Sequence, residues 1–114
     1  MARSKLPNAL ERRDWIEATL ASERALEVAE LYLAEGRSTE AVVFLGKAQA
    51  REQLAALRQE ALTLGDGFLL RESCRALGEE PTLEHWRVLL EAARAAGKNG
   101  YADEAQRQID RMEA

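Results

Sequence analysis

The sequence has few of the residues that build sheets, disulfides or metal sites. Of its 114 residues, only 7 are glycine, 2 are proline and 5% are aromatic. Together with few β-branched residues, this argues against a β-sheet and favours long helices with a core of leucine, alanine and valine. Cysteine and histidine occur once each, as Cys74 and His85. An internal disulfide and a metal cluster of cysteine or histidine are therefore excluded, and we expect no metal and no cofactor.

The sequence also lacks a long apolar run and a strong charge of either sign. Without an apolar segment of about 20 residues, neither a membrane span nor a signal peptide is predicted. The net charge of -4 argues against a general affinity for nucleic acid. Hydrophobic residues, 46% of the total, are spread along the whole chain. We therefore expect one cytoplasmic domain, residues 1–114, with neither a membrane nor a nucleic acid as partner.

A long first helix is predicted over residues 8–35. Asn8 has the residue type of an N-cap, and Gly36 that of the glycine that follows a helix. Ser38 is positioned to cap the next helix. The first half of the long helix has no obvious partner in the sequence. Its apolar face is formed at the helical period by Trp15, Ala18, Ser22, Ala25, Ala29 and Leu33.

A change of apolar face predicts a break within residues 38–64. Apolar residues around Leu45 and those around Leu57 lie about 180° apart on one helical wheel. A single straight helix would have to be buried on opposite sides at its two ends. We therefore predict two helices, with an interruption between Gln49 and Gln53.

Turn signals divide the remaining chain into three helices. The "GDG" of residues 65–67 opens the first of them and Gly78 ends it, Thr82 is a good N-cap for the second, and Gly97 stops that one. The residues of the last helix expected to face inward are Ala105, Ile109 and Met112. The whole chain is thus predicted to be all-α, with about six helices in antiparallel pairs.

Small and large residues follow a defined order along the first helix pair. The order is Ala25, Val28, Ala29, Tyr32, Gly36, Ala41, Leu45 and Ala48. It resembles the consensus of the tetratricopeptide repeat, a pair of antiparallel helices whose small residues let the two backbones approach. Ala41 and Ala48 are accordingly predicted to be buried at helix crossings.

Two further units fit the same pattern. The second contains Leu54, Leu57, Arg58, Ala61, Gly65, Leu70, Cys74 and Leu77, and the third Trp86, Leu89, Leu90, Ala93, Gly97, Ala105, Ile109 and Met112. Arg58 departs from the pattern, because the family prefers a small residue there. The resemblance implies three degenerate repeats, at about residues 22–50, 51–82 and 83–114. They would be stacked as a short right-handed superhelix like that of tetratricopeptide repeat (TPR) proteins. An irregular antiparallel helical bundle is the alternative.

The resemblance also implies a binding surface. In this family the first helices of successive units line a concave groove that holds a peptide or a partner helix. The matching positions are Glu23, Leu26, Glu30 and Leu33, then Glu52, Ala55, Gln59 and Leu62, then Glu84, Arg87, Glu91 and Arg94. Leucines flanked by glutamates suit an amphipathic segment with basic flanks, whereas the last four residues are also spaced for pairing along their own helix. The implied function is a non-catalytic adaptor that binds a protein or peptide partner.

No pattern in the sequence indicates catalysis. His85 reads as an ordinary histidine at a helix start, and Cys74 as a core residue. A nucleophilic pair of these two residues would lack a third orienting group. The "GDG" and "GKNG" segments lack the strand–loop–helix context of phosphate-binding loops and read as turns. We therefore expect that the protein is not an enzyme.

Two other classes of function stay open. A homodimer would cover apolar residues expected to be exposed at the C-terminal end of the array, namely Leu89, Leu90, Ile109 or Met112. RNA binding draws on "DEAQRQIDRM", residues 103–112, which is similar to the end of a pentatricopeptide unit. The acidic groove and the short array count against RNA.

Overall fold

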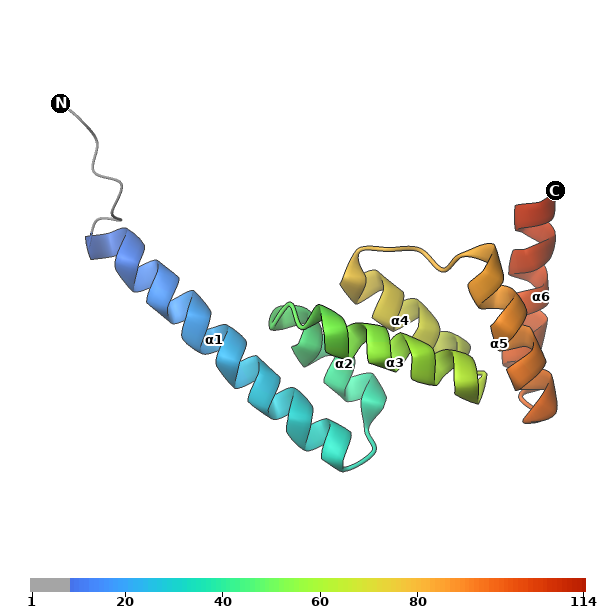
Figure 1. The fold of residues 1–114 in the computed structure, drawn as a ribbon, viewed down its shortest axis with the longest axis horizontal. Coiled ribbons are helices and arrows are strands. Elements are labelled where there is room, and N and C mark those ends of the chain that lie inside the picture. Colours follow the sequence, from blue (N-terminus) through green and yellow to red (C-terminus); the bar gives the residue numbers. More distant parts are fainter. Residues whose placement is uncertain (1–8) are drawn as a thin grey trace.

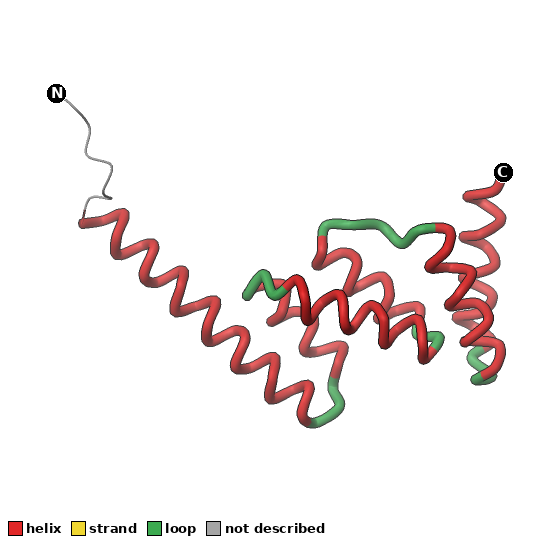
Figure 2. Tube along the Cα trace, viewed as in Figure 1, coloured by secondary structure: helices red, strands yellow, loops and turns green. Residues whose placement is uncertain are grey.

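The computed structural model describes the backbone of residues 9–114 and the side chains of residues 17–114. Its helices are α1 (Ala9–Ala34), α2 (Ser38–Lys47), α3 (Arg51–Leu64), α4 (Gly67–Leu77), α5 (Leu83–Ala95) and α6 (Asn99–Glu113). These six helices are joined by short turns, and residues 9–114 contain no strand (Figures 1 and 2). The all-α prediction and the number of helices are confirmed.

Several helix ends follow local signals in the sequence. Gly36, two residues after α1, and Gly78, directly after α4, both adopt φ values of +73°, a conformation that glycine reaches without steric cost. Asp66, which the sequence analysis did not single out, caps α4 by accepting the Leu69 N–H at 3.0 Å. The predicted cap at Ser38 is wrong, because α2 begins at Ser38 itself and the residue before it makes no side-chain cap.

The predicted break between the second and third helices is confirmed. α2 ends at Lys47 and α3 begins at Arg51, so the break lies at the start of the expected window. Gln49 turns the chain with a φ of +54°, the only positive φ of a non-glycine residue in the described part of the chain. The Ala50 N–H donates to the Leu45 carbonyl at 3.0 Å, which closes the end of α2.

The helices pack in consecutive pairs that form an extended array. α1 packs on α2, α3 on α4 and α5 on α6, and neighbouring pairs meet mainly through α2 with α4 and α3 with α5. The molecule measures 63 × 36 × 16 Å, with a radius of gyration of 18.6 Å. A compact domain of this length would have a radius of about 13 Å. α1 packs substantially on α2 alone and extends far from the other helices (Figure 1).

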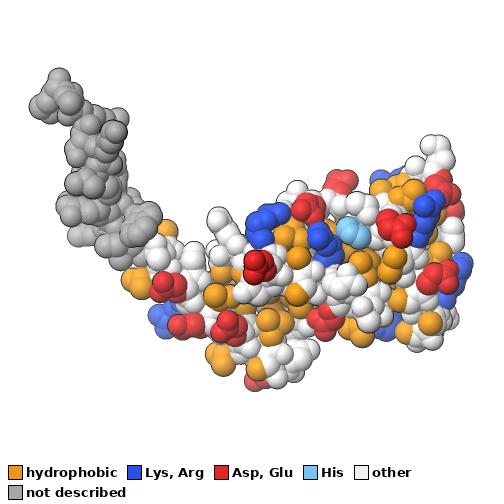
Figure 3. Space-filling view, viewed as in Figure 1, with side chains coloured by type: hydrophobic (Ala, Val, Ile, Leu, Met, Phe, Trp, Pro, Cys, Tyr) orange, Lys and Arg blue, Asp and Glu red, His pale blue; other side chains and the backbone are white. Residues whose placement is uncertain are grey.

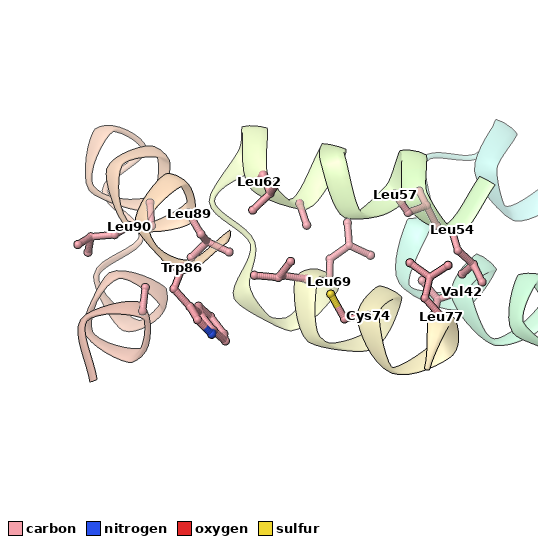
Figure 4. Close-up of a cluster of buried hydrophobic side chains, with 14 of the residues drawn as sticks. Val42, Leu54, Leu57, Leu62, Leu69, Cys74, Leu77, Trp86, Leu89 and Leu90 are labelled. Carbon is pink, nitrogen blue, oxygen red and sulfur yellow. The ribbon is translucent and has the colours of Figure 1, made fainter. Parts of the chain in front are cut away.

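The core consists of leucines and small residues from all three pairs (Figure 4). Ala41 is fully buried, as predicted, whereas Ala48 is only half-buried because it follows the last turn of α2. Met112, which was expected to face inward, is instead 42% exposed, and two further large apolar residues are similarly open, Leu64 at 45% and Phe68 at 41%. Each lies in a terminal turn of its helix, where fewer neighbouring side chains can cover it.

Candidate interaction surface

α1 is much longer than the helix it packs on. Its 26 residues span about 39 Å, whereas the 10 residues of α2 span about 15 Å. Ala25 and Ala29 are buried, but Ala18 on the same stripe is exposed. α2 therefore covers only the second half of α1, and the expectation that Ala18 faces a core is wrong. The cap predicted at Asn8 and the side chain of Trp15 lie outside the part that the structure describes.

Leu26 and Leu33 lie along the edge of α1 that faces α3. Ser38 of α2 donates to Glu60 of α3 at 3.1 Å, whereas Phe44, about 120° away around α2, stacks on Tyr32 of α1 with ring centroids 5.6 Å apart. Tyr32 therefore marks the edge of α1 that points away from α3. Leu26 and Leu33 lie about 100° or more from Tyr32 around the helix, which places them on the edge toward α3. Both leucines are half-buried and pack against the core without being enclosed by it.

A row of carboxylates borders these two leucines. Glu23 and Glu30 follow them around the helix by about 60° and are exposed. Neither carboxylate has an ion-pair or hydrogen-bond partner in residues 17–114. Acidic side chains lie along α1 on the face shown in Figure 3. The edge of α1 toward α3 is therefore an apolar strip with an acidic border.

The positions expected on α3 divide between an open face and the core. Glu52 and Gln59 are exposed, and Ala55 is half-buried. Leu62 is only 7% exposed and belongs to the core cluster at the contact between α3 and α5 (Figure 4). Leu62 therefore serves the packing of α3 rather than an open groove.

The positions expected on α5 are directed toward α6. Arg87 pairs with Glu113 at 2.5 Å, and Arg94 donates to Gln106 at 3.4 Å. Arg94 also lies 3.7 Å from Glu91, three residues earlier on the same helix. These contacts turn both arginines away from α3, so the structure does not bring them to the leucine strip of α1. The four expected positions on α5 are all exposed: Glu84, Arg87, Glu91 and Arg94.

The apolar residues at the C-terminal end of the array are mostly buried, and they do not form an exposed apolar surface. Leu89, Leu90 and Ile109 are buried, at 0%, 7% and 6% exposure, and only Met112 is open. Pairing of α5 with α6 buries these side chains, and one ion pair and one hydrogen bond between the two helices give that end a polar surface. The expectation of an uncovered apolar C-terminal end is wrong for three of its four residues.

Sequence reasoning missed a polar cluster around Arg58. Its guanidinium Nη1 lies 2.5 Å from the Glu79 carboxylate, in the loop between α4 and α5. Arg51 contacts the same carboxylate at 3.4 Å. The side chain of Arg58 is 24% exposed, so this pair is partly withdrawn from water. The signal in the sequence was the arginine itself, which stands where the repeat pattern has a small residue.

The single histidine has a structural role that the geometry defines. The Thr82 hydroxyl accepts the His85 N–H at 3.1 Å, and His85 Nδ1 accepts the Thr82 N–H at 3.1 Å. This reciprocal capping box starts α5 and confirms Thr82 as its N-cap. Burial, with a smaller contribution from Arg58, lowers the pKa of His85. His85 is thus held as a neutral hydrogen-bond acceptor.

Cys74 and the residues of metal-binding type have no feature of a reactive thiol or a metal site in residues 17–114. Cys74 is fully buried, and this burial raises the pKa of its thiol. In residues 17–114, no three histidine, cysteine, aspartate or glutamate side chains are grouped to hold a metal ion. None of the described helices combines the length and hydropathy that a membrane span requires.

The turn after α3 packs against the end of α5, and the turn after α5 reaches back to it through Lys98. A Cβ on Gly65 would lie 2.5 Å from the backbone nitrogen of Ala93, so the end of α3 and the end of α5 are in direct backbone contact. Lys98 Nζ donates to the Leu64 carbonyl at 2.8 Å across the same junction. Both turns therefore have a role in joining the second helix pair to the third.

The chain matches no protein-family model, and no curated protein or solved structure is significantly similar to it.

Proposed function

We propose that the protein is a non-catalytic, cytoplasmic adaptor that binds an amphipathic segment of a protein partner along α1. A single observation carries this proposal: Leu26 and Leu33 form an apolar strip that α3 leaves uncovered, with Glu23 and Glu30 along its border. A helix or extended peptide laid on this strip would cover both leucines.

The chemistry of the strip specifies the partner. Two leucines seven residues apart offer contacts to apolar side chains spaced by two helical turns. The adjacent carboxylates, Glu23 and Glu30, form no ion pair in residues 17–114, so they would attract basic residues that flank the apolar residues of the partner segment. Exposed charges of this kind contribute more to association rate and orientation than to affinity.

We further propose that the helix pairs are degenerate tetratricopeptide-like units. Three antiparallel pairs, contact between each pair and the next, and the full burial of Ala29 and Ala41 at the first crossing support this interpretation. In this arrangement the groove is narrower than the family pattern implies, because Leu62 is enclosed between α3 and α5. Its open part is therefore the side between α1 and α3.

Affinity capture from the extract of the native cell, read by mass spectrometry, tests the proposal. Leu26→Ser with Leu33→Ser should remove specific partners that the parent chain captures. Leu31→Ser, on the opposite face of α1, is the matched control and should retain them. A captured partner is then divided into synthetic segments, of which a basic amphipathic one should bind the parent chain. The proposal is wrong if the double variant keeps its helical content and captures the same proteins as the parent.

A further inference from the structure

The face of α1 turned away from α2 carries a pattern that is complementary to itself. It consists of Leu20, Arg24, Glu27 and Leu31, which we call the outer seam. The four residues are spaced by four, three and four positions, the spacing of a coiled-coil contact. On the helical wheel they fall within about 60° of one another, opposite the buried alanines of the α1–α2 contact.

The apolar members of the outer seam are among the most exposed large hydrophobic side chains in residues 17–114. Leu20 is 58% exposed and Leu31 is 69% exposed. The charged members between them, Arg24 and Glu27, have no ion-pair or hydrogen-bond partner in the described part of the chain. The seam therefore offers two uncovered leucines and two uncompensated charges of opposite sign.

A second copy running antiparallel would satisfy all four residues at once. Leu20 stands four positions before Arg24, and Leu31 stands four positions after Glu27, so reversing the helix reproduces the same pattern. Each Leu20 would contact the Leu31 of the other copy, and each Arg24 would pair with the Glu27 of the other copy. Such a reciprocal contact is what a two-fold symmetric dimer requires. A parallel pairing would instead place like charges opposite each other.

The position of α1 in the fold leaves room for this contact. α1 is the first helix of the array and packs substantially on α2 alone, so its opposite side faces solvent (Figure 1). We propose that two copies of the chain associate through their outer seams in antiparallel orientation. The overlap is short, since the 12 residues from Leu20 to Leu31 span about 18 Å. The buried area is therefore well below that of an obligate interface, and we expect a weak dimer that forms as the protein concentration rises.

This interface is separate from the proposed adaptor surface. The outer seam lies about 100° or more around α1 from Leu26 and Leu33, so a dimer leaves the strip of these two leucines accessible. The two proposals can therefore fail independently, one in the oligomeric state and the other in partner capture.

Sedimentation equilibrium from micromolar to millimolar concentration tests the interface. The parent chain should pass from monomer to dimer, and Leu20→Glu with Leu31→Glu should raise the dissociation constant by roughly tenfold or more. Val88→Glu, an exposed apolar residue on α5, is the matched control and should leave it unchanged. Circular dichroism should show equal helical content in all three proteins.

A charge exchange tests the orientation and register. Arg24→Glu alone and Glu27→Arg alone should each weaken the dimer, because each places like charges opposite each other. Mixing these two variants, or combining both changes in one chain, should restore association. A parent chain that stays monomeric at millimolar concentration overturns the proposal, as does a dimer that the leucine changes leave intact or that the charge exchange fails to restore.

Discussion

The Arg58 guanidinium holds the Glu79 carboxylate at 2.5 Å and so ties the middle of α3 to the loop that follows α4. The same loop leads directly to the capping box of α5, at Thr82. An arginine that breaks the small-residue pattern of the sequence thus fastens the second helix pair to the loop that leads to the third. Because the two side chains are 24% and 46% exposed, removing one partner should cost more than at a fully solvated pair and less than at a buried one.

Replacing Arg58 should therefore destabilise the protein moderately. Arg58→Met keeps most of the aliphatic stem but removes the charge, and should lower the free energy of unfolding by about 1 kcal/mol. The comparison is Arg51→Met, since Arg51 is 63% exposed, contacts the same carboxylate at 3.4 Å and donates to the Leu77 carbonyl at 3.1 Å. Its effect should be smaller than that of Arg58→Met, because its side chain is more exposed to solvent. Urea unfolding measures both, and equal effects would show that the Arg58 contact has no special weight.

The backbone contact between α3 and α5 predicts unequal costs at two glycines of the same conformation. Gly65 and Gly78 have φ values of +70° and +73°, so alanine is strained at either position, by about 1–2 kcal/mol. A Cβ at position 65 would additionally lie 2.5 Å from the Ala93 nitrogen, whereas nothing lies within 4 Å at position 78. Gly65→Ala should therefore reduce the midpoint of thermal unfolding clearly more than Gly78→Ala. Equal reductions would mean that α3 and α5 separate easily.

Features set by neighbouring residues could be predicted from the sequence. Gly36, Gly78 and Thr82 act at helix ends through their own backbone preferences, and the break at Gln49 follows from a change of apolar face. The cap at Ser38 failed because α2 starts one residue early, which frees the hydroxyl to reach Glu60.

The facing of side chains at helix contacts was harder to predict. Whether Leu62 is open or buried depends on a rotation of α3 by a few tens of degrees, and sequence spacing alone does not fix that rotation. The repeat pattern predicted that Arg87 lines a groove, whereas in the structure its side chain forms an ion pair with Glu113 of α6. The exposure of Ala18 follows from the short length of α2, which a pattern within α1 cannot reveal.

Overpacking the first helix crossing should destabilise the fold. Ala41 of α2 is fully buried where α2 packs on its neighbouring helices, so Ala41→Leu should lower the free energy of unfolding by about 1–3 kcal/mol. Ala56→Leu, at an exposed position on α3, adds the same atoms without a crossing and should change stability little. Chemical denaturation distinguishes the two. An unchanged midpoint for Ala41→Leu would refute close contact at this crossing and weaken the tetratricopeptide-like interpretation.

Stability should depend on pH through the capping box of α5. The folded state requires neutral His85, whose Nδ1 accepts the Thr82 N–H, and its pKa is lowered below the ordinary value of 6.5. The unfolded chain therefore binds the proton more readily, and unfolding is favoured as the pH falls. The contribution of His85 is complete above pH 6.5 and is lost as the pH falls through the folded-state pKa. His85→Gln is the matched control, because glutamine can accept the same N–H in a capping box without titrating in this range. Between pH 7.5 and pH 5 the parent should lose more unfolding free energy in urea than His85→Gln does, and parallel losses would show that His85 does not titrate as described.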